Sequence, residues 1–239
     1  MSEAMTDRLR GLLEVSPERD AQISAEIRAE RDREHARQLD HIMRPLIESI
    51  GPAYAKATLD GMEIYHAAQK PIVSELQQFQ SNIADHAKRG AGIVLYGPSG
   101  CGKDHAAASI MLHAAREHLL GGLSINLRDL SGADFPAAER IIERATNRSA
   151  AIVTLTDPGH LNDVASDRIY RIAEGRARAG LTTFLTVNAT SVEEIERILG
   201  PAIWGRIAMP AAIVRQCAWP NYRTRVMKRR EHAKATANQ

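Results

Sequence analysis

Residues 97–104 read Gly-Pro-Ser-Gly-Cys-Gly-Lys-Asp, with glycine at the first and sixth positions and lysine at the seventh. This spacing matches the phosphate-loop pattern G-x-x-x-x-G-K, in which a serine or threonine usually follows the lysine. A glycine-rich turn that leads into a helix directs backbone N–H groups and the positive end of the helix dipole toward an anion. The pattern therefore predicts a polyphosphate-binding loop in which Lys103 reaches the β and γ phosphates.

The residues expected to bind nucleotide extend from the loop into the first turn of the following helix. Cys101 is expected to fill the loop as a small residue rather than to act as a redox group, and His105 to face the helix surface. The residues predicted to contact nucleotide here are Gly97, Pro98, Ser99, Gly100, Cys101, Gly102, Lys103, Asp104 and His105.

Asp104 departs from the pattern, because a hydroxyl at this position normally ligates Mg²⁺ together with a carboxylate at the end of a central strand. The matching strand ends in Thr156-Asp157-Pro158-Gly159, where two acids would be usual. With Gly159 kept in its usual place, Thr156 occupies the metal-carboxylate position and Asp157 the position that polarises water. We therefore hypothesise an exchange in which Asp104 supplies the carboxylate and Thr156 the hydroxyl.

Two alternatives remain open at this metal site. Asp104 could repel the β phosphate in a decayed site, because two negative charges close together destabilise each other. In a second register Asp157 itself binds the metal and Pro158 stands where the catalytic acid should be, which predicts nucleotide binding with little hydrolysis.

Apolar and helical stretches alternate around the loop. Short apolar, β-rich runs are predicted as strands at 92–96, 123–127, 150–155 and 181–187. Helical patterns are predicted at 64–83, 103–119, 137–146, 163–179 and 192–199. Such alternation predicts an α/β fold, a three-layer sandwich around a central parallel sheet with helical crossovers.

The amino-terminal part differs in composition. Residues 17–49 are dense in charge, with sparse apolar positions at Ile23, Ile27 and Leu39, which predicts an exposed helix that is either a solvated arm or a partner-binding module. We expect a helical region at 1–50, a nucleotide-binding domain at 51–226 and a basic tail at 227–239.

The overall composition excludes several classes of protein. The 239 residues carry 31 Lys and Arg against 29 Asp and Glu, so the net charge of +2 does not by itself indicate nucleic acid. Two cysteines are too few for a disulfide framework and fit a reducing compartment. There is no apolar run of membrane-spanning length and no signal-peptide core, so we expect a cytoplasmic protein.

The chain resembles the DnaC/IstB-like family of AAA+ ATPases, which includes replicative helicase loaders and transposition helpers. The loop continues as Lys-Asp-His-Ala-Ala-Ala-Ser-Ile, similar to the loaders' G-K-[TN]-H-L-A-A-A-I. Residues 219–226, Trp-Pro-Asn-Tyr-Arg-Thr-Arg-Val, resemble the family's W-x-S-Y-R-x-R-V ending, which favours loaders. The resemblance implies an AAA+ domain that binds ATP and Mg²⁺, a hexameric replicative helicase and single-stranded DNA, and that self-associates.

The resemblance also implies roles for single residues. Asn188 would be the polar sensor that orients water or the γ phosphate, although a turn-capping asparagine is the competing interpretation. Arg206 would be the finger that reaches a neighbouring subunit's nucleotide, although Pro201 and Ala202 stand where the family's box has Glu-Arg. Arg223 would be a second sensor within its own chain, unless it is a surface arginine. Lys103, Asp157, Asn188 and Arg206 are thus the candidate catalytic residues.

The sequence therefore favours an ATP-responsive helicase loader whose amino-terminal helices dock on the ring helicase. Hydrolysis is expected to be weak because of the altered metal site. The alternatives are an IstB-like transposition helper on duplex DNA and a non-hydrolysing phage or mobile-element adaptor. A cluster of basic residues near the carboxy terminus predicts either a single-stranded DNA contact or a solvated tail. These residues are Arg223, Arg225, Lys228, Arg229, Arg230 and Lys234.

Overall fold

The computed structural model describes residues 17–159, 161–227 and 229, and it contains one five-stranded parallel sheet. The strand order is β2-β3-β4-β1-β5, so β1 lies inside the sheet with β4 and β5 as neighbours. The strands are β1 (Gly92–Tyr96), β2 (Gly122–Asn126), β3 (Ile152–Thr156), β4 (Thr182–Val187) and β5 (Ala211–Gln216). The predicted α/β class with a parallel sheet is confirmed.

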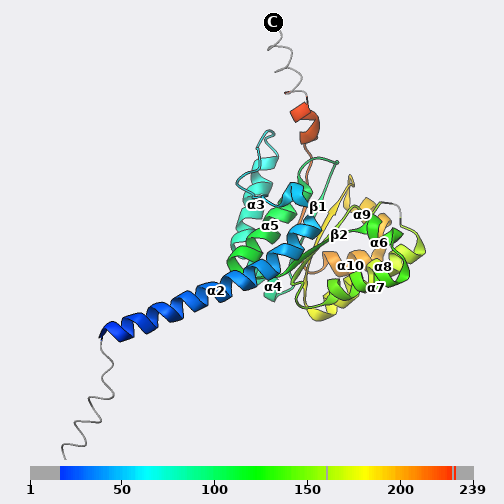
Figure 1. The fold of residues 1–239 in the computed structure, drawn as a ribbon. Helices are drawn as coiled ribbons and strands as arrows, with labels where there is room; N and C mark the ends of the chain where they lie inside the picture. The colour runs from blue at the N-terminus through cyan, green and yellow to red at the C-terminus, as the bar shows by residue number, and fades with distance from the viewer. Residues whose placement is uncertain (1–16, 160, 228, 230–239) are drawn as a thin grey trace, which may run out of the picture. The chain divides into compact units, whose positions relative to one another are not determined.

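Helices cover both faces of the sheet (Figure 1). Helices α3, α4 and α5 pack in one hydrophobic cluster, and α6 to α10 pack in the other. The helices are α2 (Pro17–Ile50), η1 (Pro52–Tyr54), α3 (Gln69–Ser81), α4 (Ile83–Lys88), α5 (Lys103–His118), α6 (Leu127–Gly132), α7 (Phe135–Thr146), α8 (Asp163–Ala179), α9 (Val192–Leu199) and α10 (Pro201–Ala208).

The central strand β1 shows why the two layers form. Successive side chains of a strand point to opposite faces. Ile93 and Leu95 accordingly belong to the cluster with α5, whereas Val94 belongs to the cluster with α8, and all three are fully buried. A strand buried on both faces reads as a continuous apolar run, which is why the sequence predicts β1 well.

Strand β5 is absent from the sequence-based predictions. Its six side chains include one buried residue, Ile213, and the others are half-buried or exposed because β5 is an edge strand that pairs only with β1.

The predicted helix at 64–83 is also shorter in the structure. Helix α3 begins at Gln69, whose buried side-chain oxygen accepts hydrogen bonds from the backbone N–H groups of Tyr65 and His66 and so holds the preceding segment as a turn.

The chain divides into two compact units, residues 1–41 and 42–239, with the boundary inside α2. The described part of the first unit is the charged segment of α2, on which Ile23 and Ile27 are 43% and 47% exposed. In the second unit, the last turns of α2 pack into the core through Leu46, which is fully buried. None of the helices in the described residues is long and apolar enough to cross a membrane.

A buried arginine joins α8 to the strands beside it. Arg176 is fully buried and donates five hydrogen bonds, at 2.5 to 3.1 Å, without a carboxylate partner among them. Burial lowers the pKa of Arg176 to about 9, so the guanidinium remains charged at neutral pH. The acceptors are the carbonyls of Ala145, Ala150, Ala151 and Thr182 and the hydroxyl of Thr183.

Candidate functional site

The phosphate loop joins the end of β1 to the start of α5 and depends on glycine at two close approaches. Gly97 has φ +144°, and a Cβ there would lie 2.5 Å from the carbonyl oxygen of Cys217. Gly100 has φ +76°, and a Cβ there would lie 2.2 Å from Oδ1 of Asn221. These positions therefore need glycine both for the backbone conformation and for the segment that packs on the loop.

Lys103 folds back over its own loop. Its ammonium lies 2.9 Å from the carbonyl oxygens of both Gly97 and Pro98 and 3.0 Å from Oδ1 of Asn188. The residue is 6% exposed. No carboxylate among the described residues forms an ion pair with it. A buried cation without a counter-charge is costly, so an anion entering the loop would find a positive charge already in place.

Three predicted catalytic residues form one hydrogen-bonded series. Asn188, after β4, accepts from Lys103 and donates through Nδ2 to Oδ1 of Asp157 at 2.8 Å. Asp157, after β3, has φ +52°, an uncommon conformation for a residue with a side chain and one often found at functional sites. The ends of two neighbouring parallel strands thus place a carboxylate and an amide beside the lysine.

Asp104 is held by a residue that the sequence did not single out. The hydroxyl of Thr186, on β4, donates to Oδ1 of Asp104 at 2.5 Å. The hydroxyl of Thr156 instead donates to the carbonyl of Ile125 at 3.4 Å. Asp104, Thr156 and Asp157 nevertheless line one cavity of about 300 Å³ on the β3 side of α5.

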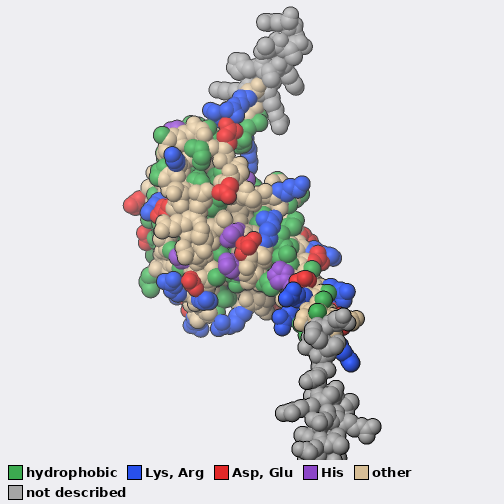
Figure 2. Space-filling model, turned by 90° about the vertical axis from the view of Figure 1, so that its left-hand side faces the viewer, with side chains coloured by type: hydrophobic (Ala, Val, Ile, Leu, Met, Phe, Trp, Pro, Cys, Tyr) green, Lys and Arg blue, Asp and Glu red, His purple; other side chains and the backbone are tan. Residues whose placement is uncertain are grey.

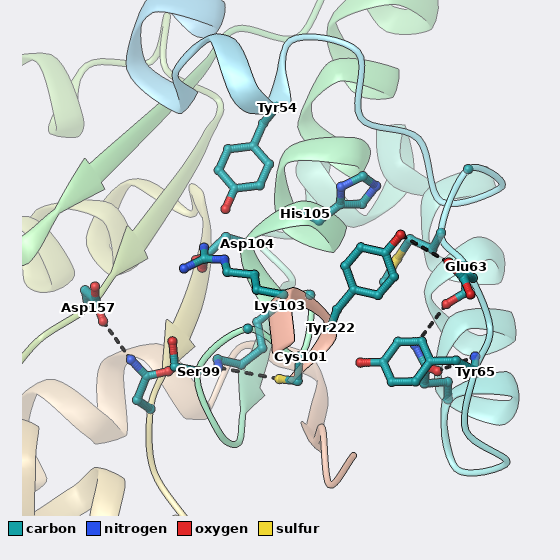
Figure 3. A pocket seen from close by; sticks show the side chains of 17 residues that line it. Tyr54, Glu63, Tyr65, Ser99, Cys101, Lys103, Asp104, His105, Asp157 and Tyr222 are labelled. Carbon is teal, nitrogen blue, oxygen red and sulfur yellow. Dashed lines mark hydrogen bonds between the residues drawn. The ribbon is translucent and has the colours of Figure 1, made fainter. Parts of the chain in front are cut away.

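A second cavity of about 310 Å³ lies over the loop and is shown in Figure 3. Its floor is the loop with Lys103 and Asp157, and its walls come from the 54–69 segment and from the carboxy-terminal segment. The aromatic and charged side chains around it include Tyr54, Glu63, Tyr65, His105, Tyr222 and Arg223. His105 does not simply face solvent, because its Nε2 lies 3.1 Å from the carbonyl of Thr58.

The carboxy-terminal segment packs directly on the loop. The indole N–H of Trp219 donates to the carbonyl of Cys101 at 2.7 Å, and the backbone N–H of Tyr222 donates to the carbonyl of Gly100 at 2.9 Å. Trp219 is 3% exposed, as expected for a core residue, whereas Trp204 is half-buried. Sequence analysis placed the segment near the site by resemblance only, because these contacts join residues more than 100 positions apart.

Glu63 also holds the carboxy-terminal segment, through a hydrogen bond and two ion pairs. It accepts a hydrogen bond from the Tyr222 hydroxyl at 3.1 Å and forms ion pairs with Arg225 at 3.6 Å and Arg229 at 2.8 Å. Burial raises the pKa of Glu63, but these three partners outweigh it and hold the pKa below the usual range. Two of the clustered basic residues, Arg225 and Arg229, are therefore paired within the chain, while Lys228, Arg230 and Lys234 lie outside the described residues.

Arg206 does not line either cavity at the loop. It forms a short ion pair with Glu174, donates to the Tyr170 hydroxyl at 3.0 Å and lies 4.6 Å from the centre of that ring. The structure thus brings Lys103, Asp157 and Asn188 together, with Arg223 at the cavity wall, and leaves Arg206 on another part of the unit.

No family model matches the sequence, and no curated protein is similar to it. Among solved structures, the chain is similar to the DnaC helicase loader with 20% identity and a TM-score of 0.59, over 69% of this chain and 99% of that one. The similarity to DnaI has 19% identity and a TM-score of 0.59, over 73% and 92%. AMPPCP-bound DnaA from Aquifex aeolicus matches with 13% identity and a TM-score of 0.56, over 76% and 55%. The chain therefore has the AAA+ fold of DnaC-type helicase loaders.

Proposed function

We propose that the cavity over the loop binds ATP with Mg²⁺ and that the protein is a nucleotide-dependent helicase loader. The observation that carries the nucleotide part is the buried ammonium of Lys103, which contacts carbonyls and an amide but no carboxylate of the described residues. A triphosphate would supply the missing negative charge, and the loop N–H groups would supply the remaining contacts. Titration calorimetry with ATP and Mg²⁺ tests this directly.

The residues around Lys103 have separate tasks in this proposal. Lys103 leaves Gly97 and Pro98 for the phosphates, Asn188 orients the attacking water, and Asp157 polarises it. Arg223 contacts nucleotide in its own chain. Arg206 serves a neighbouring subunit and must first be released from Glu174, because one guanidinium cannot hold both partners in the observed geometry.

The residues beside the loop fit Mg²⁺. This ion takes one or two carboxylates together with phosphate oxygens and waters, and two carboxylates and a hydroxyl line one cavity here: Asp104, Asp157 and Thr156. The ion would neutralise charge on the phosphates. Within the proposal, Asp104 supplies the carboxylate oxygen and Thr156 the hydroxyl, while the Thr186 hydroxyl orients Asp104.

A double-mutant cycle tests this exchange. We expect Asp104→Thr and Thr156→Asp each to weaken Mg²⁺-dependent ATP binding about 10-fold, and the combined variant to recover most of the loss, because in this proposal both residues ligate the same ion and residues with a shared partner couple. Calorimetry at several Mg²⁺ concentrations measures the effect. Additive losses in the combined variant would contradict the exchange. Thr186→Val should reproduce part of the Asp104→Thr defect, since it removes the donor that orients Asp104.

Asp104 also favours a second candidate function. A carboxylate next to the phosphates opposes their charge unless a metal lies between them. A protein with this residue could bind nucleotide and hydrolyse it slowly or not at all, as a non-hydrolysing adaptor would. Phosphate release measured with helicase and single-stranded DNA present distinguishes a slow ATPase from an adaptor.

The loader part of the proposal rests on the fold and on the charged helix. The described part of the first unit presents two exposed apolar side chains one turn apart, Ile23 and Ile27, among ion-paired charges. Such a pair suits docking of one helix in an apolar groove of a partner. The partners in this proposal are a hexameric replicative helicase, single-stranded DNA and further copies of the chain.

In this proposal, single-stranded DNA would contact separate basic residues rather than one continuous basic surface. On the face shown in Figure 2, Lys and Arg side chains are intermixed with acidic and apolar ones. Each phosphate contact adds its own contribution to affinity, so a few exposed arginines of the carboxy-terminal segment other than Arg223, such as Arg229, would suffice for a weak single-strand contact.

Replacing both exposed isoleucines tests the docking role. The full-length Ile23→Ser/Ile27→Ser variant should lose at least 10-fold in affinity for the purified ring helicase of the same genome, because apolar anchors account for most of such binding. Ala25→Ser, which changes an exposed residue of the same helix, is the matched control. Unchanged affinity in the double variant would contradict docking through this face. Binding to a transposase together with ATP-dependent filaments on duplex DNA would favour the transposition helper instead.

A further inference from the structure

The two cysteines of the chain lie together at the phosphate loop. Cys101 is part of the loop and Cys217 directly follows β5, and they are 1% and 2% exposed. Both belong to the buried cluster around α5, and their thiols interact. Cys101 is expected from the sequence to fill the loop as a small residue, and the sequence does not show that Cys217 lies near it.

The surrounding backbone fixes this contact. The N–H of Cys217 donates to the carbonyl of Tyr96 at 2.6 Å, one residue before the loop. The missing side chain of Gly97 lets the carbonyl of Cys217 approach the loop. On the other side, Trp219 donates to the carbonyl of Cys101. These contacts hold the backbones of both cysteines at the loop.

The surroundings also activate one of the two sulfurs. The ammonium of Lys103 lies 3.6 Å from the Cys101 sulfur, and α5 begins two residues later, so positive charge faces the sulfur. The hydrogen bond from Cys217 and the charge of Lys103 outweigh burial and lower the pKa of Cys101 to about 7. The same hydrogen bond and burial raise the pKa of Cys217. Cys101 is thus the nucleophile and Cys217 the resolving thiol.

We propose that Cys101 and Cys217 form a reversible disulfide, with a hydroperoxide as oxidant, and that this bond switches off nucleotide binding at the loop. The switching part rests on the proposed function. Cys101 lines the cavity over the loop, through which a molecule as small as hydrogen peroxide can reach it.

The chemistry proceeds in two steps. The Cys101 thiolate attacks one peroxide oxygen, the O–O bond breaks, and a sulfenic acid and hydroxide form. The sulfur of Cys217 then attacks the sulfenic sulfur, the S–O bond breaks, and the hydroxyl group leaves as water with the proton of the Cys217 thiol. The two sulfurs lose two electrons, which the peroxide takes up, and a thiol reductant reverses the oxidation.

Formation of the disulfide would change the conformation of the phosphate loop. An S–S bond is about 2 Å long, so the two sulfurs must approach further than in the hydrogen-bonded pair. The loop would move with Cys101, whose backbone N–H is one of the predicted phosphate donors. ATP should oppose oxidation in return, because it draws Lys103 away from the sulfur, and coupling between two sites is reciprocal.

Peptide masses and nucleotide binding together test the proposal in the full-length protein. Reduced protein is treated with hydrogen peroxide, digested without reductant and searched for the peptide pair joined through Cys101 and Cys217. We expect this pair to form, ATP affinity to fall at least 10-fold, and dithiothreitol to restore it. Saturating ATP should slow disulfide formation at least 10-fold.

Cys217→Ser is the matched variant. Untreated, it should bind ATP like the reduced wild type; treated with peroxide, it should stop at the sulfenic acid, which dimedone traps on Cys101. Absence of the joined peptides in the wild type, or a disulfide that leaves ATP affinity within twofold, would overturn the proposal. Reduced protein that binds no nucleotide would overturn the proposed function instead, while joined peptides there would still support a redox site.

Discussion

Replacing Lys103 with methionine should abolish measurable ATP binding and leave the nucleotide-free protein at least as stable as the wild type. Charged hydrogen bonds contribute about 1.5–3 kcal/mol each, so losing two phosphate contacts should weaken binding at least 100-fold. The free protein, in contrast, loses a buried cation whose contacts include no carboxylate of the described residues. Replacing such a charge with an apolar side chain of similar length is often neutral or stabilising. Lys103 and Asn188 line the cavity over the loop, so water can take the place of the ammonium at its acceptors, which is not the case around the fully buried Arg176.

Calorimetry and thermal unfolding measure the two halves of this prediction. Lys70→Met changes an exposed lysine at the start of α3 and should alter neither quantity. A Lys103→Met protein that unfolds at a much lower temperature would show that the lysine mainly supports the loop. A protein that retains ATP affinity would show that the phosphates lie elsewhere.

Replacing Arg176 with methionine should lower the free energy of unfolding by about 3–5 kcal/mol, because it leaves five buried acceptors without their donor. Four of these acceptors are carbonyls near the starts of β3 and β4 and the end of α7. The Arg176 side chain therefore joins three elements, two of which, β3 and β4, lead at their far ends to Asp157 and Asn188. Chemical unfolding followed by circular dichroism gives the value.

Arg178→Met is the control for this change, because Arg178 lies on the same helix with its side chain 80% exposed and one ion pair to Glu174. Exposed ion pairs contribute about 0–1 kcal/mol, so this variant should remain close to the wild type. Equal losses in the two variants would mean that the buried hydrogen bonds of Arg176 contribute little.

The parts of the fold that sequence predicts are those encoded locally. Strand β1, the loop and α5 follow one another, and each has its own signal: a doubly buried apolar run, glycines at fixed spacing and an alanine-rich helix. Strand β5 lacks such a signal, because only one of its six side chains, Ile213, is buried and the strand ends in the exposed polar residues Arg215 and Gln216.

The site likewise combines residues that the sequence identifies with contacts that only the structure shows. Lys103 and the loop glycines are identified by spacing, Asp157 by its place after a strand, and Asn188 by the resemblance to the loader family. The partner of Asp104 is Thr186 rather than Thr156 in the hydrogen bonds of the structure, a choice set by the geometry of neighbouring strands that sequence does not show. The contact between Cys101 and Cys217 likewise depends on how β5 and the segment after it fold back on the loop. The roles of these residues stay predictions until they are measured.

The dependence of the loop on Trp219 and Tyr222 has a consequence for the order of assembly during synthesis. The glycine motif leaves the ribosome long before residues 219–223 do, yet Trp219 and Tyr222 pack on the loop, and Tyr222 and Arg223 line its cavity. A nascent chain that ends before them carries the whole motif without the finished pocket. The capacity to hold a ligand would therefore emerge only once residues 217–223 have been synthesised, and a truncation before residue 217 would remove it without touching the motif.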